Sequence, residues 1–186
     1  LKNIGININT IPVLDVLRTH TSKVIRDRSF SNDKKIVQKL GKITVEHCNT
    51  LKIATVAKHI PGHGFAISDS HITTPRVNLD EGKLKKIDFY PFKYNPAQFA
   101  MTAHILYTKI DKKNVATLSK KIIYNIIRKK IGFKGILISD DISMKALKYD
   151  LVTNAIKSLE AGCNLVLYCA GNIDDNFKLI KSIPFI

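Results

Sequence analysis

The sequence is poor in the residues that mark disordered, disulfide-rich or membrane-spanning proteins. Its 186 residues include only 6 prolines, 9 glycines and 3 cysteines, and no apolar run approaches the ~18 uninterrupted residues that a membrane span needs. Apolar residues nevertheless make up 45% of the chain, which is enough to fill a hydrophobic core. The composition therefore excludes a disordered chain and a membrane partner, and it predicts a single globular domain over residues 1–186.

The cysteines and the first residues bear on the compartment. Cys48, Cys163 and Cys169 are odd in number and have no CxxC spacing, so we predict core thiols in a reducing compartment rather than a disulfide or metal framework. Residues 1–10 contain neither an initiator Met nor the basic and apolar regions of a signal peptide. We expect a chain that begins within a longer protein and is not secreted.

Arginine is also scarce, although the chain is strongly basic. Lys and Arg number 30 against 15 Asp and Glu, giving a formal charge of +15, yet only 5 of the 30 are Arg and 27 Ile accompany them. Such a Lys and Ile excess is what an AT-rich coding bias produces, whereas bidentate phosphate recognition favours Arg. We therefore predict no nucleic-acid partner, and keep a basic nucleic-acid-binding module as a third alternative.

Short apolar runs alternate with longer amphipathic segments. The runs are typical of buried strands, and the amphipathic segments carry apolar residues at helical spacing. The predicted strands are 4–8, 53–57, 100–103, 135–139 and 164–168, with a sixth at 183–186, and the predicted helices are 33–49, 119–131, 143–161 and 173–182. This alternation predicts an α/β fold with a parallel sheet, interrupted by two long loops at 59–86 and 109–117.

Polar residues collect where the predicted strands end. Lys58 and His59 follow the second strand, His104 follows the third, and Asp140 follows the fourth. In parallel α/β folds the carboxyl ends of the strands surround the ligand, so this cluster predicts a functional site.

Each member of the cluster also has a plain structural interpretation. Asp140 and Asp141 could cap a helix that begins near Ser143, and this interpretation suits Asp141 better. Asp69 and His71 could form a hydrogen-bonded pair in which the carboxylate fixes the imidazole tautomer. They could equally belong to a surface turn.

A zinc site is another possible interpretation of the polar cluster. His59, His63, Asp69 and His71 have suitable side chains, but their spacing matches no known zinc-ligand pattern, so we predict no metal.

Two long motifs in register carry a resemblance to a known family. KHIPGHG with a following DSH, and later GFKGILISDDISMKAL, are similar to the KHFPGHG, DSH and GFxGxxxSDDLxM patterns of the bacterial β-N-acetylglucosaminidases of glycoside hydrolase family 3. The chain matches that family further in the segments INTIPVLDV (8–16), RDRSFSND (26–33), AMTAHILY (100–107), ATLS (116–119) and AGCNLVL (161–167).

The resemblance implies a (β/α)₈ TIM-barrel fold and a retaining, exo-acting enzyme. It makes Asp140 the nucleophile and His71 the acid/base, partnered by Asp69. It also implies an enzyme that works in the cytoplasm, recycles cell-wall material and releases N-acetylglucosamine from muropeptide-derived saccharides without a metal or organic cofactor. The residues that would hold the sugar are Arg28, Lys58 and His59. The residues that would support the site are Asp141, Met144 and His63.

The implied chemistry is consistent with these residue types. A carboxylate can form a glycosyl-enzyme while an acid/base protonates the leaving oxygen and then activates water. Histidine departs from the usual second carboxylate, but its ordinary pKa near ~6.5 suits both steps. Because a histidine is neutral after giving up its proton, phosphate could compete with water as the acceptor.

The sequence differs from the family pattern at its N-terminal end. A (β/α)₈ barrel takes ~250 residues, and the family's early strands and its Asp-Gln-Glu-Gly-Gly stretch have no counterpart here. We therefore expect an incomplete barrel, from a fragment or a shortened homologue, and keep a non-catalytic sugar-binding fragment as the second alternative.

Overall fold

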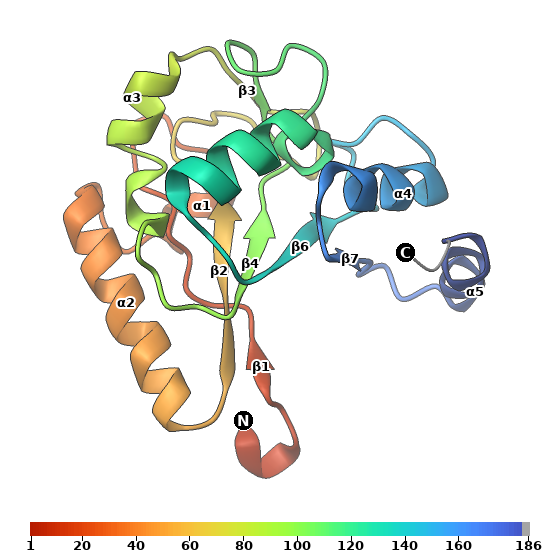
Figure 1. The fold of residues 1–186 in the computed structure, drawn as a ribbon, viewed down its shortest axis with the longest axis horizontal. Coiled ribbons are helices and arrows are strands. Elements are labelled where there is room, and N and C mark those ends of the chain that lie inside the picture. Colours follow the sequence, from red (N-terminus) through yellow and green to blue (C-terminus); the bar gives the residue numbers. More distant parts are fainter. Residues whose placement is uncertain (184–186) are drawn as a thin grey trace.

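The computed structural model describes residues 1–183, and its centre is a five-stranded sheet in which every neighbouring pair is parallel (Figure 1). The order of the strands in space is β1-β2-β4-β6-β7. Their bounds are β1 Ile8–Asn9, β2 Ala54–Ile60, β4 Phe99–Thr102, β6 Ile136–Asp141 and β7 Leu165–Leu167. The strands of this sheet thus follow one another in chain order, without the reversal seen in doubly wound sheets.

Helical segments connect these strands. The longer ones are α2 Lys34–Thr50, the π-helix η4 Ile122–Ile131, α4 Leu151–Ala161 and α5 Ile173–Ser182, and the shorter ones are η1 Lys2–Ile4, α1 Lys23–Arg26, α3 Glu81–Lys86, η2 Tyr90–Phe92 and η3 Ala116–Leu118. In Figure 1, α2 lies at the left beside β2 and α4 lies at the right near β7, with α5 beyond it at the C-terminal end. No helix within residues 1–183 is long and apolar enough to cross a membrane.

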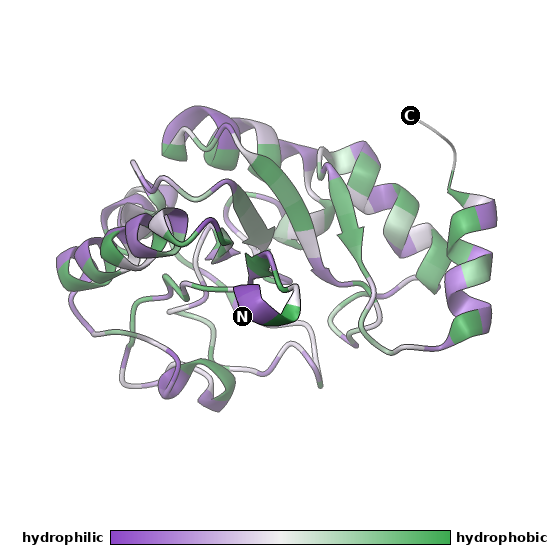
Figure 2. Cartoon of the chain, turned by 90° about the horizontal axis from the view of Figure 1, so that it is seen from below, coloured by the Kyte–Doolittle hydropathy of each residue, from purple (hydrophilic) through white to green (hydrophobic). Residues whose placement is uncertain are grey.

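The helix before β2 shows how the sequence builds one covered face of the sheet. Asp33 caps α2 by accepting a hydrogen bond from the Lys35 N–H (2.7 Å). Val37 and Val45 lie on one side of the helix and are fully buried, in a core cluster that includes Ala57 of β2 and Leu137 of β6. Seen from below, the strands are mainly hydrophobic and the helices carry hydrophilic stripes (Figure 2).

The opposite face of the sheet is less covered. Strand register places Ile8, Ile136 and Leu165 on this face, and their exposed fractions are 44%, 40% and 47%. Lys58 and Asp140 alternate in phase with these residues, so they leave the same face at its carboxyl end. The less covered face of the sheet therefore carries the charged residues of the predicted site.

The predicted α/β fold is confirmed, with shifted strand bounds. The segment predicted as a strand over 4–8 begins as η1, because Gly5 adopts a left-handed conformation (φ 82°) and ends that turn, so β1 starts only at Ile8. The predicted strand at 135–139 extends to Asp141, so Asp140 lies within β6. The sixth predicted strand, 183–186, lies outside the described residues except for Ile183, which is not in a strand.

One predicted helix, 143–161, was wrong in its first half. The side chain of Asp141 accepts hydrogen bonds from Ser143 N (3.0 Å) and Ser143 Oγ (2.7 Å), which closes a turn. The Ala146 N–H donates to Ser70 O rather than within a helix. The helix begins at Leu151, where Asp150 supplies the cap by accepting from the Thr153 N–H (3.0 Å).

The long segment predicted as a loop over 59–86 contains structure of its own. β3, Arg76–Val77, pairs in parallel with β5, Leu106–Tyr107, in a separate two-stranded sheet, and α3 follows. This small sheet holds the far end of the loop that carries Asp69 and His71.

Candidate functional site

A buried aspartate organises the site at the end of β2. The segment after β1 runs beside β2, with Leu14 N donating to Lys58 O and Lys58 N donating to Pro12 O (3.0 Å). This places Asp15, which is fully buried, next to His59. Asp15 Oδ2 lies 2.7 Å from His59 Nδ1, and Oδ1 accepts from the His63 backbone N–H (2.7 Å). The pairing fixes the His59 ring through Nδ1 and leaves Nε2 for another partner.

The electrostatics of Asp15 agree with this arrangement. Burial alone raises the pKa of the Asp15 carboxyl, but the His59 ring and the His63 N–H together hold it below its ordinary value. Asp15 is therefore an ionised acceptor in the interior. Sequence analysis missed it, although an acidic residue inside the apolar segment IPVLDV was a readable signal, because carboxylates are rarely buried without partners.

His63 is buried beside this pair. Its ring centroid lies 5.8 Å from that of His59, and neither ring nitrogen has a hydrogen-bond partner among the described residues. Burial lowers the pKa of His63, against the opposing effect of Asp15, so the ring is held neutral.

Lys58 and Arg28 line one cleft of about 500 Å³, together with Val13 and Phe30. Ser29 Oγ donates to Asp15 O (2.7 Å), which ties the segment carrying Arg28 to the buried pair. Burial and the nearby Arg28 charge lower the pKa of Lys58, while Asp140 and Asp15 oppose that shift. The cleft thus brings two predicted sugar-binding cations together at the end of β2.

His71 and Asp69 form the predicted pair in an exposed loop. His71 Nδ1 lies 2.8 Å from Asp69 Oδ1, which also accepts from the His71 backbone N–H (2.8 Å). Burial raises the pKa of Asp69, but the two contacts from His71 lower it below its usual range. The other ring nitrogen, Nε2, has no partner within residues 1–183 and is available for proton transfer.

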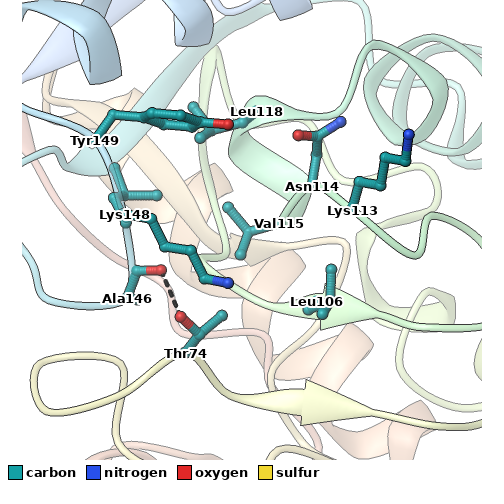
Figure 3. A pocket seen from close by; sticks show the side chains of 10 residues that line it. Thr74, Leu106, Lys113, Asn114, Val115, Leu118, Ala146, Lys148 and Tyr149 are labelled. Atoms are coloured by element: carbon teal, nitrogen blue, oxygen red, sulfur yellow. Dashed lines mark hydrogen bonds between the residues drawn. The ribbon is translucent and has the colours of Figure 1, made fainter.

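The His71 loop is attached to the segment that follows Asp140. Ser70 O accepts from Ala146 N (3.1 Å), and Thr74 Oγ1 donates to Ala146 O (2.8 Å). Figure 3 shows the second contact beside a small cavity of about 40 Å³, whose lining includes Val115 and Tyr149. Hydrogen bonds therefore join the loop that carries Asp69 and His71 to the segment that follows Asp140.

Asp140 and Asp141 have different surroundings. Asp140 Oδ1 accepts from the Asp141 N–H (2.9 Å), and its second carboxylate oxygen accepts no hydrogen bond from the described residues. Asp141 binds Ser143 as described above, and also accepts from the Cys169 N–H (3.2 Å). Asp141 therefore stabilises loops, whereas Asp140 keeps an unengaged oxygen.

Two further residues support this end of the sheet. His104 is fully buried, with Nδ1 2.7 Å from Thr117 Oγ1 and Nε2 3.0 Å from Asp141 O. Met144 is buried, and its N–H donates to Asp141 O (3.1 Å). Both residues pack around the loop that follows β6.

Within residues 1–183, no group of three or more His, Cys, Asp or Glu side chains is placed to hold an ion. His59 Nδ1 is engaged by Asp15 and His71 Nδ1 by Asp69, and the Nε2 atom of each ring has no hydrogen-bond partner among the described residues.

The structure described so far is that of a parallel α/β domain, with a carboxylate at the end of β6 and a histidine–aspartate pair in the loop that follows β2. A family comparison makes the assignment specific. The chain matches the glycosyl hydrolase family 3 N-terminal domain over residues 1–184 and belongs to that family.

Individual relatives agree with this membership. A beta-hexosaminidase of Actinobacillus succinogenes is 36% identical over 97% of this chain and 55% of its own length. A family 3 beta-N-acetylglucosaminidase from Paenibacillus superposes with a TM-score of 0.92 at 29% identity, over 98% of this chain and 36% of that one. NagZ from Neisseria gonorrhoeae, in complex with N-trifluoroacetyl-D-glucosamine, gives a TM-score of 0.89 at 30% identity, over 100% and 53%. The chain thus spans about half the length of the curated relatives it matches.

Proposed function

We propose that this chain carries the catalytic machinery of a retaining exo-β-N-acetylglucosaminidase. The observation that carries the proposal is the Asp69–His71 pair, held by its loop against the segment that follows Asp140. Membership of glycosyl hydrolase family 3 and the names of the relatives support the substrate class.

In the first step, the free carboxylate oxygen of Asp140 attacks the anomeric carbon of the terminal sugar. His71 Nε2 gives its proton to the leaving glycosidic oxygen, and Asp69 stabilises the imidazolium before transfer. The glycosidic bond breaks, and a covalent glycosyl-enzyme forms on Asp140. Lys58 and Arg28 line the cleft at the end of β2, so they can donate to sugar hydroxyls there. His59 follows Lys58 in β2, and its Nε2 is the ring nitrogen that Asp15 does not engage, so it is the third proposed donor.

In the second step, neutral His71 takes a proton from water as the water attacks the anomeric carbon. The bond to Asp140 breaks, and the sugar leaves with its original anomeric configuration. The mechanism uses only side chains of this chain. His63, His104, Asp141 and Met144 hold the surrounding loops.

The sheet further supports an incomplete (β/α)₈ barrel as the fold of this piece. Its strands are parallel and follow in chain order, and one face is less covered, as expected for the interior side of a barrel sector. The matched relatives are about twice as long as this chain, so they have room for the further strands that a closed barrel needs.

The biological setting is part of the proposal. Cys48, Cys163 and Cys169 are free thiols, which is consistent with the reducing cytoplasm. There the enzyme would release N-acetylglucosamine from muropeptide-derived saccharides during cell-wall recycling.

The decisive experiment uses an aryl β-N-acetylglucosaminide. We expect release of the aryl alcohol, and Asp140→Ala should reduce it by about 10³-fold or more, as for loss of other covalent nucleophiles. Asp174→Ala, at an exposed site in α5, is the matched control and should retain activity. A folded wild-type chain that binds N-acetylglucosamine without turnover would support the alternative of a non-catalytic sugar-binding fragment.

A further inference from the structure

A second buried carboxyl lies against the turn that carries His63. Asp88, between α3 and η2, is fully buried. Its Oδ2 accepts from the Phe65 N–H (3.2 Å), and its Oδ1 has no partner among the described residues. A buried acceptor for one backbone N–H does not require a carboxyl group, so the choice of aspartate calls for an explanation.

The turn at 62–65 is held by side chains from several parts of the chain. His63 N donates to Asp15, Phe65 N donates to Asp88, and Tyr107 Oη donates to Gly62 O (2.5 Å). The two buried carboxyls thus bind alternate backbone N–H groups of the same turn. One of them, Asp15, also fixes the ring of His59.

Glycines in the turn make the contact with Asp88 close. A Cβ atom at Gly62 would lie 2.7 Å from Asp88 Cβ, and one at Gly64 would lie 2.9 Å from Asp88 Oδ1 and 2.2 Å from Val16 O. The backbone of the turn therefore packs directly on Asp88. A displacement of Asp88 must move the turn, and with it the His63 N–H that binds Asp15.

We propose that Asp88 is a positioning residue for the sugar-binding side of this site, acting through the 62–65 turn on the Asp15–His59 pair. The inference rests on the proposed glycosidase function for its kinetic consequences. Asp88 reaches the proposed sugar contacts only through the turn, so it takes no part in the chemical steps.

The charges around Asp88 support a role for its proton. The pKa of the Asp88 carboxyl is raised to about 7, chiefly by burial and also by the Asp15 carboxylate, while the Phe65 N–H and Arg18 oppose the rise. The Tyr107 phenol also faces Asp88, and burial, Asp88 and Asp15 raise its pKa well above the ordinary value, so it stays neutral. Above pH 7, ionised Asp88 adds a second buried negative charge, and its repulsion by Asp15 opposes the close packing of the turn between them.

The kinetic test compares Asp88→Asn and Asp88→Ala with the wild type on an aryl β-N-acetylglucosaminide from pH 5 to 9. The asparagine keeps an acceptor for Phe65 N but cannot ionise, so it should retain most activity at pH 6 and lose less above pH 7 than the wild type. The alanine should raise KM more than it lowers kcat, reducing kcat/KM by up to about 10²-fold, as misplacement of binding groups does. Asp80→Asn, an exposed position in the same segment, is the matched control.

A spectroscopic readout separates this proposal from the glycosidase function. The proton on His59 Nδ1, bound to Asp15, should give a downfield NMR signal in the wild type. We expect that signal to shift or broaden in Asp88→Ala and to respond to pH near 7 in the wild type but not in Asp88→Asn. If the wild type is inactive but the signal behaves in this way, the proposed function fails and the positioning role stands. An unchanged signal in Asp88→Ala, or pH profiles that superimpose for the wild type and Asp88→Asn, would overturn the positioning role.

Discussion

Two histidine–aspartate pairs in the described residues have nearly equal N···O distances, but one pair is buried and the other is exposed. His59 and Asp15 lie 2.7 Å apart with side chains 8% and 0% exposed, and His71 and Asp69 lie 2.8 Å apart with side chains 58% and 32% exposed. The buried pair is braced by the turn at 62–65 and by Ser29, whereas the exposed pair belongs to a loop fixed mainly at Ser70 and Thr74.

This difference in exposure favours different roles for the two pairs. A buried pair cannot exchange protons with water easily, so it suits the fixed orientation of a binding group. An exposed pair has its outer nitrogen in solvent, so it suits a group that must lose and regain a proton in each cycle. We therefore propose that a histidine and an aspartate position the sugar where they are buried, and transfer a proton where they are exposed.

The largest effect should come from breaking the buried pair. Asp15→Ala leaves His59 Nδ1 and the His63 N–H without an acceptor in the interior, and we expect it to lower the free energy of unfolding by about 3–5 kcal/mol. Urea denaturation followed by circular dichroism measures this change. A loss no greater than that of Asp69→Ala would show that burial does not distinguish the two pairs.

Breaking the exposed pair should affect catalysis and leave stability nearly unchanged. Asp69→Ala should cost less than about 1 kcal/mol in unfolding, as exposed ion pairs do, but should reduce kcat by about 10²-fold or more because the acid/base loses its orienting partner. Turnover of an aryl glycoside and urea denaturation, measured on the same sample, give both values. Loss of stability in parallel with activity would contradict the assignment.

The smallest effect concerns pH and the buried histidine next to the first pair. Burial lowers the pKa of His63, so the unfolded chain takes up a proton near pH 6.5 before the folded one does. Stability from this group is complete above pH 6.5 and is lost as the pH falls, by up to about 2 kcal/mol at pH 5. His63→Gln should show a shallower fall in unfolding free energy between pH 7 and 5, and parallel curves for the two proteins would refute this.

The sequence was informative about residues that follow apolar strands. Lys58, His59 and Asp140 lie at carboxyl ends of the sheet as predicted, because the run of buried residues that precedes each of them fixes its position along the strand. Asp15 and Asp88 lie within the apolar segments IPVLDV and KIDFYPF, which indicates buried carboxyl groups but not what they bind. Their partners are backbone N–H groups more than twenty residues away, which no local pattern reveals.

The prediction of a helix from Ser143 was wrong over residues 143–150 because tertiary contacts were again invisible in the local sequence. Residues 143–150 have helical spacing, but Asp141 and Ser70 take up their backbone groups in tertiary contacts. Local propensity predicts a helix only where the backbone has no stronger partner elsewhere. The roles proposed for Asp140, His71 and Arg28 remain predictions that the experiments above address.

The less covered face of the sheet has a practical consequence for experiments on this chain. Ile8, Ile136 and Leu165 present branched hydrocarbon to water along three of the five strands, and such patches favour self-association. Sulfate and phosphate salts strengthen the tendency, because they are excluded from protein surfaces. Kinetic measurements should therefore be made in dilute samples and repeated at several protein concentrations, so that aggregation is not mistaken for inactivity.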